Sequence, residues 1–242
     1  MTFAQLVFVR RAAMSFSATT SSSSLSPPAR WFSLLECAFG VFVVVGHNIF
    51  HFLPNEVPIL FILGWISLRW RNGGWKYAGL RRPQSWWKTI ALAMVAAAIL
   101  LLGSELIVEP LSHRIWPGPE HVSHIIQSGA SGWRQALVGL LIVWTFASFG
   151  EEMSYRGYLL TRASEVLGRS SLAYWAAMIL VSLLFGFGHY YKGPSGVVDS
   201  AYSGLALGAA YLLAGRNLWV PILAHGAADT VAIFVVFIGW AH

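Results

Sequence analysis

Charged residues are scarce in this chain. Only 11% of the 242 residues are Asp, Glu, Lys or Arg, whereas about a quarter of the residues in a soluble domain are charged. So few charges cannot cover the surface of a water-soluble domain of this length. Cysteine is almost absent as well, because Cys37 stands alone. A single thiol excludes an intrachain disulfide and a metal site with several thiolate ligands.

Apolar and aromatic residues take the place of the missing charges. The chain is 56% hydrophobic, has 12 Trp and 8 Tyr, and has a mean hydropathy of +0.60. Trp and Tyr favour membrane interfaces, and a membrane helix needs roughly 20 apolar residues. We therefore predict an all-α fold, a polytopic transmembrane bundle of about seven helices, with six to eight as the range. The predicted helices are 33–53, 57–70, 87–109, 134–161, 171–191, 197–214 and 218–239.

The basic residues are distributed unevenly between the predicted loops. If seven helices alternate from a cytoplasmic N-terminus, only Arg114, Arg134 and Lys192 face the far side, with a long loop at 110–133. Cytoplasmic loops of membrane proteins carry the excess of Lys and Arg. The net charge of +6 is thus a topology signal and does not indicate nucleic-acid binding. The residues on the cytoplasmic side are Arg10, Arg11, Arg30, Arg69, Arg71, Lys76, Arg81, Arg82, Lys88, Arg162, Arg169 and Arg216.

The first 30 residues differ in composition from the rest. They contain three arginines, no acidic residue and a run rich in Ser and Pro. This composition resembles an organellar transit peptide, but no convincing cleavage site follows, so we expect residues 1–30 to form a disordered tail. Residues 31–242 are expected to form one transmembrane domain, because membrane helices satisfy their polar groups only by packing together.

Three clusters of polar residues interrupt the apolar helices of the second half. Ionisable side chains inside a membrane are costly and are usually functional. Residues four apart share a helix face, which predicts a Glu152–Arg156 ion pair and leaves Glu151 pointing elsewhere. Phe185 lies one turn before His189, so its ring can form a wall of a pocket beneath the imidazole. The clusters are Glu151-Glu152-Met153-Ser154-Tyr155-Arg156, Phe185-Gly186-Phe187-Gly188-His189 and His225-Gly226-Ala227-Ala228-Asp229.

In order and spacing, these clusters resemble the motifs of the CPBP family of intramembrane proteases. This family includes the CAAX prenyl endopeptidases of the Rce type and bacteriocin-immunity (Abi) proteins, and its pattern is Glu-Glu-x-x-x-Arg, Phe-x-x-x-His, then His-x-x-x-Asn or Asp. The segment 77–83 also resembles a basic loop of bacterial members. The third motif ends here in Asp229, whereas the prenyl endopeptidases carry Asn, which puts a prenylated substrate in question more than hydrolysis itself.

The resemblance implies an intramembrane endopeptidase. Glu151 and His189 would polarise a water molecule, and His225 would face the oxyanion, with Asp229 orienting or charging it. Glu152, Arg156 and Phe185 would support the site. The resemblance further implies a lipidated or membrane-embedded peptide substrate and a bacterial inner (plasma) membrane location. The predicted topology puts Glu151 and His189 at one level, about 16 and 19 residues from the cytoplasmic turn between their helices, so we expect the site to be reached from the cytoplasm.

Three alternatives stay open at this stage. The first is a divalent metal such as zinc, held by Glu151, His189, His225 and Asp229; we favour a metal-free mechanism because a His-Glu-x-x-His signature is absent. The second is a proton- or ion-coupled transporter, since buried Glu, His and Asp also form proton relays. The third is a non-catalytic immunity or binding protein with the same fold.

Overall fold

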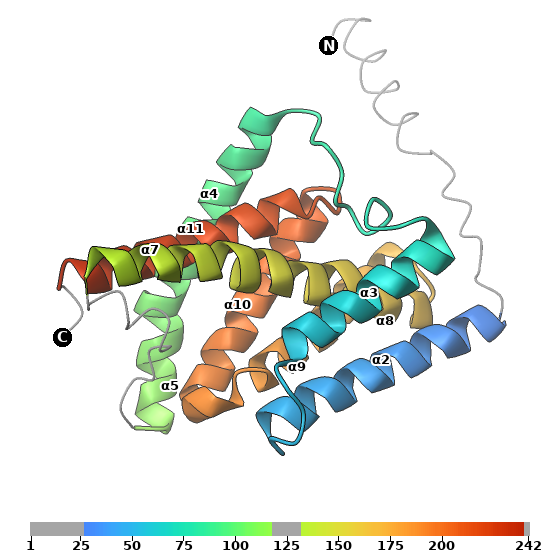
Figure 1. Ribbon diagram of the computed structural model, residues 1–242, viewed down its shortest axis with the longest axis horizontal. Helices are drawn as coiled ribbons and strands as arrows, with labels where there is room; N and C mark the ends of the chain where they lie inside the picture. Colours follow the sequence, from blue (N-terminus) through green and yellow to red (C-terminus); the bar gives the residue numbers. More distant parts are fainter. Residues whose placement is uncertain (1–26, 118–131, 240–242) are drawn as a thin grey trace, which may run out of the picture.

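All regular structure in the described part of the chain is helical. A computed structural model describes residues 27–117 and 132–239, and the helices join into seven continuous rods, which confirms the all-α prediction. Figure 1 shows α2 and α3 running alongside each other on one side of the bundle, with the α4–α5 rod on the opposite side. The rods are α2 (Pro27–Asn48); α3 (Glu56–Asn72); α4 (Trp86–Gly103), η1 (Ser104–Val108) and α5 (Glu109–Ile115); α7 (Trp133–Ile142), η3 (Val143–Leu159) and α8 (Leu160–Val166); α9 (Ser171–Phe187); η4 (Tyr190–Lys192) and α10 (Gly193–Leu213); and α11 (Trp219–Phe237).

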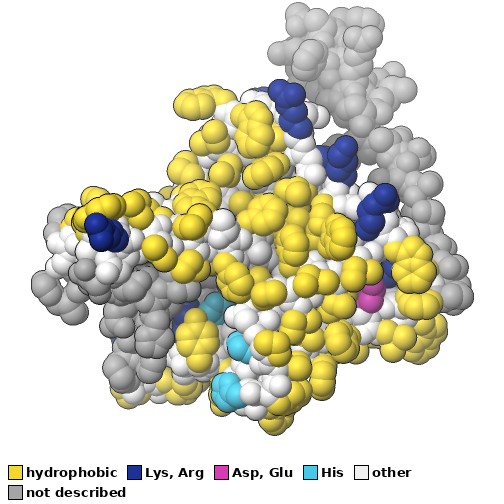
Figure 2. Space-filling view, viewed as in Figure 1, with side chains coloured by type: hydrophobic (Ala, Val, Ile, Leu, Met, Phe, Trp, Pro, Cys, Tyr) yellow, Lys and Arg dark blue, Asp and Glu magenta, His cyan; other side chains and the backbone are white. Residues whose placement is uncertain are grey.

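Five of these rods are long and apolar enough to cross a membrane, and α9 is a shorter apolar helix. Large apolar side chains cover the outside of the bundle, among them Trp87, Leu172 and Leu213, each more than three-quarters exposed. Figure 2 shows such side chains spread over most of one face. A surface of this kind is stable only in a bilayer. The chain is therefore an integral membrane protein.

Several predicted boundaries were wrong. Residues 110–115 continue the third rod through Pro110 instead of forming a loop, because a proline near a helix start costs little and η1 loosens the rod just before it. The fifth rod ends at Phe187, so His189 lies in a turn. Four residues of the predicted 1–30 tail open α2. The remainder of that tail, and residues 118–131 of the predicted loop, lie outside the described residues.

Two cores hold the rods together. The larger joins the η3–α8 segment to α2, α3 and α9, with Leu60, Met153, Tyr158 and Phe185 among its buried members. The smaller is built from small side chains of α4 facing α11, with Ala93 and Ala224 fully buried. Without a hydrophobic driving force between helices, membrane proteins rely on such close packing.

Two glycines, Gly204 and Gly208, bring α10 against α9. A Cβ at Gly204 would lie 2.9 Å from the Ser182 Cβ, and one at Gly208 would lie 2.5 Å from the Met178 Cγ. Both distances are below van der Waals contact, so only glycine allows this approach. It sets the distance between the helix that precedes His189 and the helix that lines the neighbouring cavity.

Candidate active site

The first motif lies in a widened stretch of helix. Residues Val143–Leu159 (η3) are π-helical, so each turn holds more residues than in an α-helix, and the α-helical offset assumed between Glu151 and Glu152 does not apply. The Glu152–Arg156 ion pair that the spacing predicts is present, with 2.9 Å between Arg156 Nη1 and Glu152 Oε1. π-Helical segments often occur at functional sites.

Glu152 is the centre of a buried hydrogen-bond network. Its side chain is fully buried, and Oε1 also contacts Nδ1 of His225 on α11 at 3.0 Å. Arg156 donates in addition to the carbonyl oxygen of Gly204 on α10 at 3.1 Å. The Glu152–Arg156 pair thus ties η3 to both α10 and α11. Glu151, partly buried, takes no part in these bonds, although it lies close enough to His225 and Asp229 to interact with them electrostatically.

His225 stands between two carboxylates. Nδ1 faces Glu152, and Nε2 lies 3.5 Å from Oδ2 of Asp229, four residues along the same helix. A carboxylate only accepts hydrogen bonds, so Nδ1 carries the proton toward Glu152, and the negative charge of Asp229 beside Nε2 favours a second proton there. The site therefore favours an imidazolium at His225, which suits a group that stabilises negative charge.

His189, in contrast to His225, is held as a neutral ring with one nitrogen free to accept a hydrogen bond. Its Nδ1 lies 2.9 Å from the carbonyl oxygen of Phe185 and must donate to it, which leaves Nε2 of the neutral ring as a hydrogen-bond acceptor. The Phe185 ring packs on the imidazole with centroids 4.7 Å apart. The Arg156 guanidinium covers the same phenyl ring at 4.6 Å. Phe185 thus fixes His189 through both its backbone and its ring.

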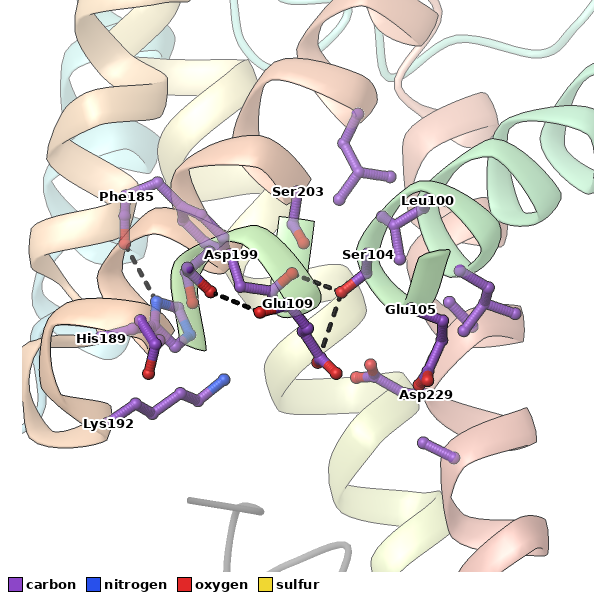
Figure 3. Close-up of a pocket in the computed structure, with 18 of the residues that line it drawn as sticks. Leu100, Ser104, Glu105, Glu109, Phe185, His189, Lys192, Asp199, Ser203 and Asp229 are labelled. Atoms are coloured by element: carbon purple, nitrogen blue, oxygen red, sulfur yellow. Dashed lines mark hydrogen bonds between the residues drawn. The ribbon is translucent and has the colours of Figure 1, made fainter. Parts of the chain in front are cut away.

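His189, His225 and Asp229 line one cavity of about 260 Å³, together with Phe185. Glu151 is not among its lining residues. The opposite wall comes from the α4–α5 rod and α10, where the Ser104 hydroxyl bonds to the carboxylates of Asp199 and, at 3.5 Å, of Glu109 (Figure 3). Other polar residues on this wall and floor are Glu105, Ser112, His113, Lys192, Ser195, Ser200 and Ser203.

The alternative zinc site does not fit this arrangement. Zinc needs three protein ligands around a shared centre. Over residues 27–117 and 132–239, no group of three or more His, Cys, Asp and Glu side chains is placed to hold a metal ion. Of the four residues suggested as ligands, His225 has both ring nitrogens directed at carboxylates, those of Glu152 and Asp229.

Sequence reasoning missed the parts of the site that come from the first half of the chain. Ser104 and Glu109 were both placed near the end of the predicted helix 87–109 without a role, and Glu56 was given none either. A signal was available for Glu56, since an acid at the edge of an apolar run is costly unless it is used. Glu56 contacts His47 of α2.

A scan of protein-family models matched residues 133–231 to the family described as type II CAAX prenyl endopeptidase Rce1-like. Searches of curated proteins and of solved structures each found no match. The matched range begins with α7 and ends two residues after Asp229, so it contains all three motifs and the ion-pair network between them. Residues 133–231 form a domain of the Rce1-like type II CAAX prenyl endopeptidase (CPBP/Abi) family.

Proposed function

We propose that the protein is an intramembrane endopeptidase that hydrolyses a peptide bond with a water molecule activated by Glu151 and His189. The observation that carries the proposal is the shared cavity: His189 from the turn after α9 meets His225 and Asp229 from α11, within a domain of a protease family. Peptide hydrolysis needs a base for the water proton and a donor for the oxyanion. His189 offers a hydrogen-bond acceptor to the water molecule, whereas His225, between two carboxylates, is a hydrogen-bond donor for the oxyanion.

In the proposed reaction, the water molecule gives a proton to Glu151, with His189 Nε2 accepting its second hydrogen bond. The oxygen then attacks the substrate carbonyl, and the imidazolium of His225 stabilises the oxyanion. Asp229 keeps His225 protonated, since its Oδ2 lies 3.5 Å from Nε2. Glu151 then passes its proton to the leaving amine. Oε1 of Glu152 accepts from both Arg156 and His225, so its role in the proposal is to fix these two groups.

The substrate in this proposal is a lipidated or membrane-embedded peptide. Apolar side chains surround the bundle, so a chain segment reaches the cavity from the bilayer or its interface. The cavity itself has a polar wall of serines and carboxylates, which provides hydrogen bonds for a peptide backbone that has left water. Family membership favours a lipid-modified C-terminal tail, whereas Asp229 in place of Asn leaves room for a different tail chemistry.

The test is substrate trapping with Glu151→Ala. Membranes that contain the wild type or the variant are compared by quantitative proteomics, and peptides that accumulate with the variant are then synthesised and incubated with purified protein. We expect the variant to lose cleavage by about 10²–10⁴-fold, the usual contribution of a general base. Its thermal unfolding in detergent should match the wild type. Full cleavage by Glu151→Ala, or no cleavage of any trapped peptide by the wild type, would contradict the proposal.

A further inference from the structure

A second acid–histidine pair lies outside the family domain. Glu56 opens α3 and is buried, with only 5% of the residue exposed. Its Oε2 is 3.5 Å from Nε2 of His47 on α2. His47 Nδ1 contacts the carbonyl oxygen of Leu53 at 3.0 Å and so carries a proton. The two groups are therefore close enough to form an ion pair when His47 is protonated.

This pair contacts the first motif through a tyrosine. The Tyr155 hydroxyl lies 3.5 Å from Oε1 of Glu56, and both residues are buried. Tyr155 is in η3, three residues after Glu152. Buried polar groups are costly unless they have partners, so the Tyr155 hydroxyl and Glu56 depend on each other. No role in the proposed hydrolysis has been assigned to either.

The same hydroxyl packs on the turn that presents His189. A Cβ built at Gly188 would lie 2.9 Å from Tyr155 Oη and 3.5 Å from Glu56 Oε1. The Tyr155 ring also meets the Phe185 ring edge-on, with centroids 4.9 Å apart at 86°. Phe185 in turn holds His189 through its carbonyl oxygen and its ring. Glu56 and Tyr155 therefore support the residues on both sides of the turn.

We propose that Glu56 is a positioning residue for His189: held by His47, its carboxyl group fixes the Tyr155 hydroxyl against Gly188 and thereby sets the orientation of the imidazole. This inference rests on the hydrolytic role proposed for His189. It assigns a function in the site to α2 and α3, which lie outside the matched domain. Glu56 acts through Tyr155 and does not touch the substrate.

Three variants separate positioning from other roles. Glu56→Ala and Tyr155→Phe each remove the hydrogen bond, and we expect kcat to fall by about 10–100-fold with KM little changed, since small misplacements near the chemistry have effects of this size. The double variant should be little worse than either single variant, because both substitutions break the same contact between Glu56 and Tyr155. Glu56→Gln should restore most of kcat: its amide oxygen accepts from Tyr155, and its amide N–H donates to neutral His47.

Tyr211→Phe is the matched control. Tyr211 is also fully buried, and its hydroxyl donates to the carbonyl oxygen of Ala78 at 2.8 Å, away from the site residues. Tyr211→Phe should lower the stability about as much as Tyr155→Phe does. Its kcat, calculated for the folded fraction of the protein, should stay at the wild-type value. An unchanged kcat in both Glu56→Ala and Tyr155→Phe would overturn the positioning role, and so would a Glu56→Gln variant as impaired as Glu56→Ala.

A readout independent of cleavage keeps this inference separate from the proposed function. NMR of ¹⁵N-histidine-labelled protein in detergent reports the tautomer and environment of His189, assigned with His189→Gln. We expect Glu56→Ala and Tyr155→Phe to shift the His189 signals, whereas Glu56→Gln and Tyr211→Phe should not. Shifted signals in a protein that cleaves nothing would support positioning and contradict the protease. Unchanged signals in Glu56→Ala would overturn positioning, whatever the activity, and this variant decides alone if Tyr155→Phe does not fold.

Discussion

At the scale of single residues, Glu152 and Glu151 have different tasks although they are neighbours. Glu152 is fully buried and its Oε1 bonds to both Arg156 and His225, while Glu151 stays outside this network. Removal of one member of a buried ion pair leaves the partner charge without compensation, and this costs more than the loss of the attraction itself. The two carboxylates should therefore be separable by experiment.

Glu152→Ala should destabilise the protein by about 3–5 kcal/mol, because it leaves Arg156 unpaired in an apolar interior. Thermal unfolding in detergent measures this, with Glu151→Ala as the matched control one residue away. We expect a clearly lower unfolding temperature for Glu152→Ala and a value near the wild type for Glu151→Ala. Equal effects of the two substitutions on stability would show that the assignment of roles is wrong.

Part of this residue-level picture followed from the sequence. The four-residue spacing predicted the Glu152–Arg156 pair and the proximity of His225 to Asp229, because neighbours on one helix are set by local geometry. The His225–Glu152 contact was not predicted, since it joins two helices 73 residues apart in the chain. Such contacts depend on how each helix is rotated about its axis, which spacing alone does not give.

At the scale of helices, close packing sets the shape of the cavity. The α4–α5 rod supplies one wall, with Ser104 facing Asp199, and α4 packs against α11 through small side chains. Ala93 is fully buried in this contact, whereas Ala98 on the same helix is exposed to the surroundings of the bundle. The separation of α4 from α11 therefore depends on alanine at position 93.

Ala93→Leu should push α4 away from α11. Overpacking of this kind typically costs about 1–3 kcal/mol, and we expect a lower unfolding temperature together with weaker substrate binding, seen as a raised KM. Ala98→Leu adds the same volume on the exposed face and is the control, with both quantities expected near the wild type. If the two variants behave alike, the α4–α11 contact does not set the cavity.

At the scale of the whole molecule, the family domain (residues 133–231) shares its hydrophobic core with α2 and α3, which lie outside it. Met153 and Leu160 of the matched range are buried against Leu60 of α3 and Val44 of α2, in one cluster. A second, polar cluster lies between the same elements, where Arg162 is fully buried and contacts Glu36 at 3.0 Å and Glu165 at 2.9 Å. The domain recognised by sequence is thus smaller than the unit that folds.

Residues 133–242 produced alone should therefore fail to give a stable, monodisperse protein, because apolar and charged groups that α2 and α3 cover would face lipid. Co-expression with residues 27–117 should restore a folded complex, as membrane helices can assemble from fragments by packing. Size-exclusion chromatography and thermal unfolding in detergent measure both outcomes. A short chain as stable as the full protein would contradict this view of the fold.

Sequence alone determined the all-helical membrane fold and its division into seven rods, because hydropathy and helix length reflect the bilayer directly. It also indicated the protease family, because the three motifs occur in the right order. Only the tertiary structure decided which carboxylate holds His225, that η3 is π-helical, that His189 lies in a turn, and that α4 and α5 line the cavity. These features depend on the rotation and crossing of helices that are distant in the chain, and side-chain packing between helices fixes both.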